Sequence, residues 1–131
     1  MNQLTLLEIA DLLADLFEFE DVTAGCVDSS KSRTIGVYQR SEFVPRECIG
    51  TDSSYETSKI RILVHWTDNP ATAEKQAFEV AELFQSFDNI STENHIIKFA
   101  EVKAVRNIGK DEKGICEYVV DTDIIYTKKE S

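Results

Sequence analysis

The chain has 131 residues, of which 42% are hydrophobic and 29% are charged. This length and balance predict one soluble domain, residues 1–131, with a packed core, and they exclude a disordered chain and a pair of ordinary domains. The net charge of −10 and the pI near 4.6 argue against a protein that holds nucleic acid by its phosphates, because such a protein needs clustered Lys and Arg.

The first segment, residues 4–19, has apolar residues at the spacing of an amphipathic helix. Thr5 followed by Glu8 predicts a capping box at the helix start. The carboxylates exclude a membrane span, and the segment lacks the basic start of a signal peptide, so we expect the protein to stay in the cytosol where it is made. The acidic side chains of this helix form a stripe, which we interpret as a solvated face. They are Glu8, Asp11, Asp15 and Glu18.

A turn-rich interval, residues 23–32, is followed by a predicted strand over residues 33–39. The connection over residues 40–56 is long for a small domain, which indicates a functional loop, a loop ordered by a partner, or hidden strand extensions. Phe43 and Val44 within it would be unusual exposed residues for a monomer. Residues 57–66 then alternate in hydrophobicity with a period of two, which predicts a half-buried strand.

Asn69 and Pro70 predict the start of a second helix, as a capping residue followed by a proline at the first helical position. Residues 95–108 and 115–127 predict two more strands, joined as a hairpin by the glycine-bracketed polar segment 109–114. The order helix, strand, strand, helix, strand, strand predicts an α+β fold. We expect an antiparallel or mixed sheet of about four strands with two helices packed on one face.

The second predicted strand ends in His65, Trp66 and Asp68, a group that resembles a site. A metal site would need further ligands at fixed offsets, and His95, the other histidine, lies in a distant segment. We therefore interpret the group as a strand end, with Trp66 in the core and Asp68 or Asn69 capping the next helix.

The three cysteines are odd in number and widely spaced, which predicts reduced structural thiols. No nucleophile elbow and no glycine-rich phosphate loop occurs in the chain. We therefore predict no catalytic residue, no cofactor and no bound metal, and we expect a binding or assembly protein rather than an enzyme. The cysteines are Cys26, Cys48 and Cys116.

One alternative is a Mg²⁺-dependent nuclease, because Glu101 and Lys103, preceded by Asp88, imitate its acidic and lysine pattern. Exposed Glu and Lys often alternate on the solvent face of a strand by chance, and no basic surface is available to hold the substrate. Asp121 and Asp123 share one face of the last strand and could attract a cation, but a hydrated acidic face is the plainer interpretation. A further alternative is a cytosolic acidic adaptor that binds a basic partner.

Three phrases, RTIGVYQRS, YETSKIRILVHWTDNPATAEKQAFEVAELF and VKAVRNIGKDEKGICEYVVDTDIIY, together with the N-terminal helix, span most of the chain. In element order, length and strand phrasing they resemble the small tail-terminator or minor capsid (head-tail joining) proteins of phages. The resemblance implies a structural virion protein that forms a ring, typically a hexamer, at the head-proximal end of the tail tube. Such a ring ends tube growth and joins the tail to the head connector, so its partners are its own copies, the tail-tube protein and the head-completion or connector protein.

The elements that protrude are the candidates for contacts with a neighbour. We expect Phe43 and Val44 of the long loop, and Lys110, Asp111 and Glu112 of the hairpin, to lie at subunit or partner interfaces. An acidic lumen would let DNA pass without specific binding. The candidate lumen residues are Glu8, Asp11, Asp15, Glu18, Asp121 and Asp123.

Overall fold

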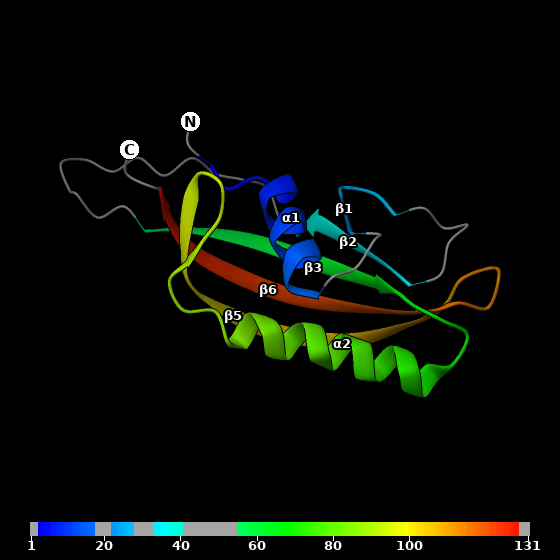
Figure 1. The fold of residues 1–131 in the computed structure, drawn as a ribbon. Coiled ribbons are helices and arrows are strands. Elements are labelled where there is room, and N and C mark those ends of the chain that lie inside the picture. The colour runs from blue at the N-terminus through cyan, green and yellow to red at the C-terminus, as the bar shows by residue number, and fades with distance from the viewer. Residues whose placement is uncertain (1–2, 18–21, 28–32, 41–54, 129–131) are drawn as a thin grey trace.

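The computed structural model describes residues 3–17, 22–27, 33–40 and 55–128. It confirms the predicted α+β class, with two helices and one sheet (Figure 1). Along the chain the elements are α1 (Leu6–Phe17), β1 (Val22–Ala24), β2 (Thr34–Gln39), β3 (Glu56–His65), α2 (Pro70–Gln85), β4 (Ile90–Ser91), β5 (His95–Lys110) and β6 (Cys116–Lys128).

The described residues form a sheet of six strands in the order β1-β2-β3-β6-β5-β4, so the expected number of about four is too low. The four long strands β2, β3, β5 and β6 are those that the sequence predicts, and they pair antiparallel. The two missed strands lie at the sheet edges: β1 pairs parallel with β2, and β4 pairs antiparallel with β5. They have three and two residues, too few to show an alternating pattern.

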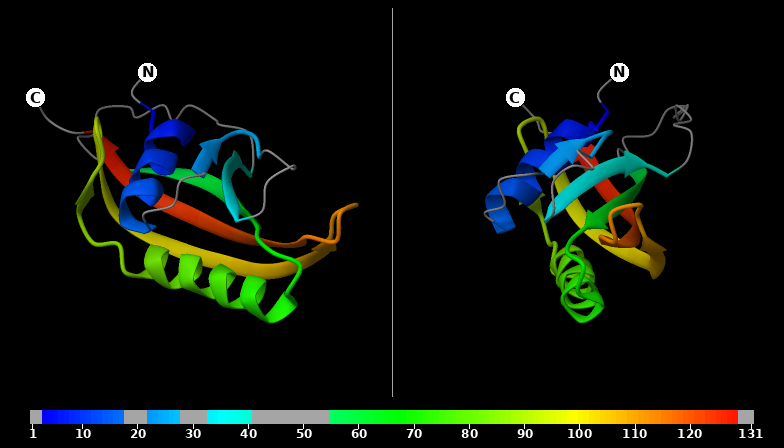
Figure 2. Two further views of the ribbon diagram at one scale, coloured as in Figure 1. Left: turned by 45° about the vertical axis from the view of Figure 1, so that its right-hand side comes forward. Right: turned by 90° about the vertical axis from the view of Figure 1, so that its right-hand side faces the viewer.

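Two hairpins, β2-β3 and β5-β6, lie side by side and are joined where β3 pairs with β6. The register of β5 against β6 shifts at three places, between Ile97 and Phe99, Val102 and Ala104, and Asn107 and Gly109. Each bulge bends its strand and increases the local twist. Figure 2 shows the result, a sheet in which β5 and β6 bend strongly along their length.

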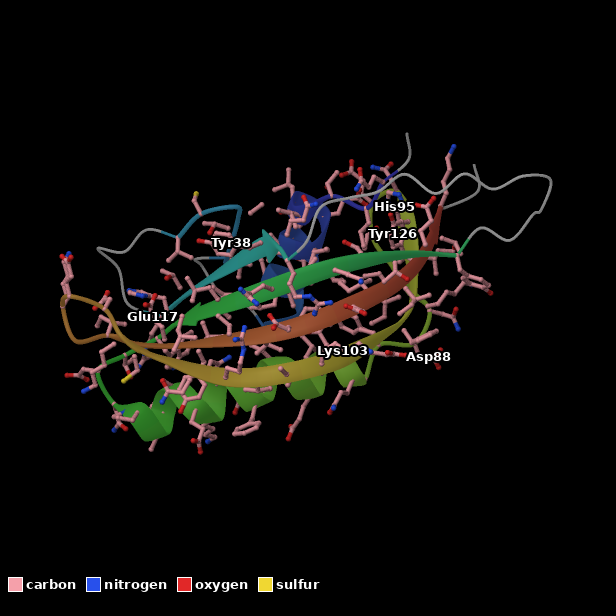
Figure 3. All side chains as sticks on the ribbon, turned by 180° about the vertical axis from the view of Figure 1, so that it is seen from behind. Tyr38, Asp88, His95, Lys103, Glu117 and Tyr126 are labelled. Atoms are coloured by element: carbon pink, nitrogen blue, oxygen red, sulfur yellow. The ribbon has the colours of Figure 1, made fainter. Side chains whose placement is uncertain are left out.

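Both helices cover the same face of the sheet, as predicted. In Figure 1 they lie in front of the long strands, and Figure 3, from behind, shows the strands in front of them. The covered face and the helices meet through fully buried side chains, among them Ile62 of β3 and Val120 of β6 on the sheet and Phe84 on α2. α2 packs mainly on β5 and β6, whereas α1 packs on β1 and β2.

The second helix starts as predicted, because the Asn69 side chain accepts hydrogen bonds from the backbone N–H groups of Ala71 and Thr72 at 3.0 and 3.3 Å. The first helix starts with half of the predicted capping box. Thr5 Oγ1 accepts a hydrogen bond from Glu8 N at 3.2 Å, but the carboxylate of Glu8 bonds to other residues.

Two further expectations concern the membrane and the thiols. Neither of the two described helices is both long enough and apolar enough to cross a membrane. Cys26 is exposed and Cys116 is buried, and both are free thiols, whereas Cys48 lies outside the described residues.

Candidate functional site

The group His65, Trp66 and Asp68 forms a strand end, as interpreted from the sequence. Trp66 is buried in the core, and the helix cap is Asn69. His65 is also buried, with Nδ1 3.0 Å from Glu117 Oε2 and Nε2 3.6 Å from Asp111 Oδ2. The imidazole therefore links the end of β3 to Glu117 of β6, and the Asp111 carboxylate of the hairpin turn lies near its other nitrogen.

The hairpin turn that carries Lys110, Asp111 and Glu112 extends beyond the ends of the other strands (Figure 1). Asp111 Oδ1 accepts hydrogen bonds from the backbone N–H groups of Lys113 and Ile115, both at 2.9 Å. The bond from Ile115 is the main reason that the pKa of the Asp111 carboxyl is lowered. Asp111 thus shapes the turn, and Lys110 and Glu112 are exposed. Phe43 and Val44 lie outside the described residues.

Glu8 does not belong to a solvated stripe, and that expectation is wrong. Glu8 is only 7% exposed. Its Oε2 accepts hydrogen bonds from Thr92 Oγ1 at 2.8 Å and from Asn94 N at 3.3 Å, and it lies 2.9 Å from His95 Nδ1. Burial raises the pKa of Glu8, but these hydrogen bonds outweigh it, so the pKa lies below its usual value. Glu8 joins α1 to the β4-β5 turn.

The other acidic side chains of α1 face solvent. Asp11 and Asp15 are exposed, whereas Glu18 lies outside the described residues. Asp11 and Asp15, together with the exposed Glu93 of the β4-β5 turn, border a hollow of about 220 Å³. This groove concentrates negative charge on the α1 side of the molecule.

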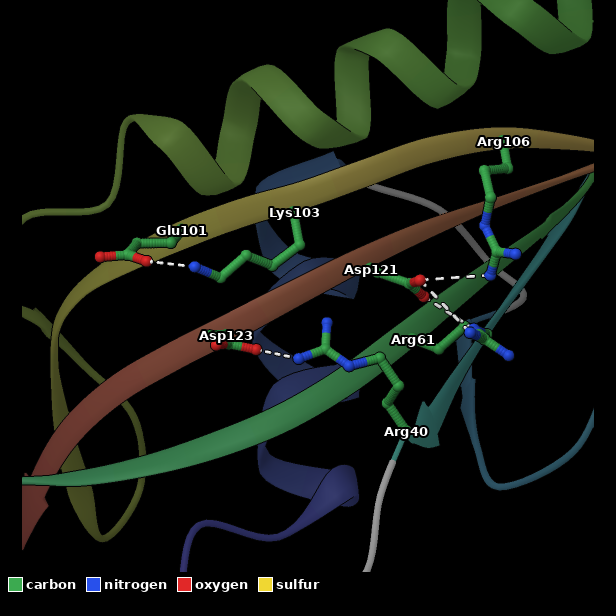
Figure 4. Close-up of polar contacts among 7 residues, drawn as sticks. All are labelled: Arg40, Arg61, Glu101, Lys103, Arg106, Asp121 and Asp123. Atoms are coloured by element: carbon green, nitrogen blue, oxygen red, sulfur yellow. Dashed lines mark hydrogen bonds and ion pairs between the residues drawn. The ribbon is translucent and has the colours of Figure 1, made fainter.

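The sheet face opposite the helices, here called the open face, carries the paired charges shown in Figure 4. Asp121 Oδ1 accepts a hydrogen bond from Arg61 Nε at 2.7 Å, and its Oδ2 accepts one from Arg106 at 3.2 Å. Asp123 pairs with Arg40. The hydrogen bond from Arg61 lowers the pKa of the Asp121 carboxyl, although burial opposes the shift.

The prediction of a hydrated acidic face at Asp121 and Asp123 is therefore wrong. The pairing of β3 with β6 places Arg61 directly opposite Asp121, and the two charges neutralise each other. On the described strands the open face has at least as many basic as acidic side chains, in a chain whose net charge is −10. They are the basic residues Arg40, Lys59, Arg61, Lys103 and Arg106 and the acidic residues Glu101, Glu117, Asp121 and Asp123.

The nuclease alternative receives no support from the geometry of its residues. Lys103 Nζ donates a hydrogen bond to Glu101 Oε2 at 2.7 Å, so the two side chains pair with each other (Figure 4). Asp88 Oδ1 accepts a hydrogen bond from the side chain of Asn89. Within residues 3–17, 22–27, 33–40 and 55–128, no group of three or more His, Cys, Asp or Glu side chains is placed to hold a metal ion.

Sequence reasoning missed an apolar hollow of about 510 Å³ at one end of the open face. Tyr55, Phe99 and Ile125 line it, together with Asp88, Asn89 and Lys98. Because Phe99 pairs with Ile125 and Glu101 with Asp123, Phe99 lies on the same face as Glu101. The alternation of β5 was the signal that could have revealed an aromatic residue on the solvent side.

The described residues thus form a small α+β fold whose helix side and open face differ in their charged groups. The chain matches the family model described as bacteriophage tail terminator protein over residues 6–128. It therefore belongs to the bacteriophage tail terminator family, whose members have a structural role in the phage tail.

The other comparisons add no functional argument. A comparison with characterised protein sequences finds no match. Seven solved chains match, among them one named only by a sequence identifier. That match covers 95% of this chain and 90% of the other at 14% identity, and its TM-score of 0.46 is too low to carry an inference.

Proposed function

We propose that the chain assembles as a ring, a hexamer by the family resemblance, at the head-proximal end of a phage tail tube. There it ends tube growth and joins the tail to the head connector, with the tail-tube protein and the connector protein as partners. The observation that carries this proposal is the family match over residues 6–128, which covers almost the whole chain.

A ring of identical subunits needs two different surfaces on each copy, because its contacts are heterologous. The chain has two such surfaces on opposite sides of one sheet: helices with exposed carboxylates on one side and arginine-carboxylate pairs on the other. The protruding hairpin, with exposed Lys110 and Glu112, offers a further contact with a neighbour or with a tail component.

The α1 side is the better candidate for the wall past which DNA moves. Asp11 and Asp15 are exposed beside Glu93, and negative charge repels phosphates, so DNA would pass without adhering. Asp121 and Asp123 suit this role less, because arginines neutralise their carboxylates.

The test is to measure molar mass by light scattering and to image the protein by negative-stain electron microscopy, alone and with tail-tube protein. We expect rings in solution or rings seated on one end of each tube. Monomers alone, in both samples, would contradict the proposal. A soluble partner lost at high salt, with no binding to tubes, would instead favour the acidic adaptor.

A further inference from the structure

His65 is a buried titratable side chain at the end of β3, and the proposed ring makes no use of it. Its side chain is 1% exposed. Nδ1 lies 3.0 Å from Glu117 Oε2, and Nε2 lies 3.6 Å from Asp111 Oδ2. Glu117 lies at the hairpin end of β6 (Figure 3), and Asp111 belongs to the hairpin turn. Each ring nitrogen therefore has a carboxylate beside it, and the two carboxylates come from different parts of the hairpin.

The two carboxylates indicate which protons the imidazole carries. An ionised carboxylate only accepts hydrogen bonds, so the 3.0 Å contact with Glu117 requires a proton on Nδ1. In a neutral ring, Nε2 would then hold a bare lone pair, buried beside the second carboxylate. Within the described part of the chain, Nε2 has no hydrogen-bond partner. A second proton removes the repulsion from Asp111 and places one positive charge between two negative ones, so the geometry favours the imidazolium form.

The other groups around His65 do not compete for its charge. Tyr38 on β2 is neutral, because burial raises its pKa and the charges of Cys26 and Glu117 raise it further. Thr34, directly opposite His65 on β2, is uncharged. The charged side chains of the neighbouring described segments are exposed or already paired. Arg33, Asp68, Lys110, Glu112 and Lys113 are exposed, and Arg61 and Arg106 both donate to Asp121.

The two oxygens of Asp111 have separate contacts. Oδ1 accepts hydrogen bonds from the backbone N–H groups of Lys113 and Ile115, both at 2.9 Å, whereas Oδ2 is the atom beside His65. The hydrogen bond from Ile115 is the main cause that lowers the pKa of Asp111, and the charge of His65 adds to it. Gly109, with a φ of 102°, precedes the turn at a place where the register of β5 against β6 shifts. The turn can therefore keep its shape while its attachment to the end of β3 changes.

We propose that the charge of His65 fixes the hairpin turn to the end of β3 and that loss of one proton releases it. In the charged form, Nε2–H faces the Asp111 carboxylate and holds the turn. When the pH rises and Nε2 gives its proton to solvent, two electron-rich groups face each other and the turn moves independently of the sheet. The contact is thus present at lower pH and lost at higher pH. Histidine ordinarily changes charge between about pH 5 and 8, where carboxylates and arginines keep theirs.

The consequence for assembly rests on the proposed function. Lys110 and Glu112 are exposed on the protruding turn, where they offer a contact with a neighbour or a tail component. A turn that is already ordered loses less conformational freedom when it binds. The charged form of His65 should therefore strengthen that contact, and the neutral form should weaken it.

The test reads the protons of His65 and the motion of the turn by NMR on the same sample. The imidazole nitrogen signals report its protons, and backbone relaxation gives order parameters for the amides of Glu112 and Lys113. At about pH 6 we expect two protons on His65 and order parameters near about 0.85, which fall toward about 0.6 as the pH is raised until the Nε2 proton is lost. A neutral ring at this lower pH, or turn amides that do not respond to loss of the proton, would overturn the proposal.

Two variants remove the charge pair at every pH. His65→Gln cannot carry the charge, and Asp111→Asn keeps the oxygen that accepts the two backbone hydrogen bonds but loses the negative charge. In neither variant should the turn become more mobile as the pH rises. Glu112→Gln, the same change at an exposed carboxylate of the same turn, is the matched control and should keep the pH dependence of the wild type. Circular dichroism verifies folding, and Asp111→Asn decides alone if His65→Gln does not fold. Wild-type pH dependence in a folded variant of either kind would overturn the proposal.

A last measurement separates this inference from the proposed function. Assembly of the wild type should weaken about threefold or more as His65 loses its proton, and assembly of Asp111→Asn should not, because only the wild type then orders the turn at the expense of binding. Rings that form equally well at both pH values would show that the turn does not control assembly. If the NMR results hold but the wild type forms no ring alone or on tubes, the proposed function is wrong and the role of His65 stands.

Discussion

The two faces of the central sheet are built from alternate residues of the same strands, yet they have opposite chemistry. On β3, Ile60, Ile62 and Val64 are fully buried against the helices, while Arg61 between them points to the open face and binds Asp121. Burial of apolar surface supplies most of the folding free energy, whereas paired surface charges supply little. The covered face thus supplies most of the stability of the fold, and the paired charges of the open face supply little of it.

Substitution on the two sides of α2 should separate these roles most clearly. Phe84 is fully buried, with its ring centroid 5.1 Å from that of Phe87, so Phe84→Ala should lower the free energy of unfolding by about 3–5 kcal/mol. Phe78→Ala, on the outer side, should change it by less than about 1 kcal/mol. Urea denaturation measures both, and equal losses would show that the two sides do not differ in role.

The ion pairs of the open face should differ among themselves according to burial. Asp121→Ala leaves Arg61 and Arg106 without their shared acceptor, and we expect a loss of about 1–3 kcal/mol in the free energy of unfolding. Glu101→Ala breaks an exposed pair with Lys103 and should leave stability unchanged within error. Thermal denaturation of the two variants compares them. A loss for Glu101→Ala as large as that for Asp121→Ala would mean that burial does not decide how much each ion pair contributes to the free energy of unfolding.

The buried Glu8 should give a smaller loss than Phe84 or Asp121, and one that depends on pH. Its pKa is lower in the folded state, so its contribution is present above the unfolded pKa of about 4.3 and is lost as the pH falls through the lower folded value. Glu8→Gln should therefore cost about 1–2 kcal/mol near pH 7, and the difference from the wild type should shrink below about pH 4. Urea denaturation across this pH range measures it, and a constant difference would contradict the assigned cause.

The sequence predicts local features well and long-range neighbours poorly. Asn69 and Pro70 place the start of α2 correctly, because a helix cap depends only on residues within one turn. The partners of Glu8 and Asp121 could not be predicted: His95 is 87 residues from Glu8, and Arg61 is 60 residues from Asp121. Only the strand order brings them together, so both carboxylates looked like solvated acids.

The same reason explains which residues of the proposed acidic lumen remain candidates. Asp11 and Asp15 remain candidates because they are exposed, whereas Glu8 and Asp121 are buried in contacts that hold the fold together. The exposed Phe78 and Phe99 are the opposite case, because local patterns are enough to predict their exposure. Their exposure follows from their places in the local pattern: Phe78 lies outside the buried side of α2, and Phe99 lies on the side of β5 away from the helices.

The most direct test of the account is the length of tail tubes grown from tail-tube protein with and without this chain, measured by electron microscopy. We predict that tubes stop growing when the chain is added and that each stopped tube carries a ring-shaped density at one end. Tubes that continue to lengthen at the same rate, with no density at either end, would contradict the account.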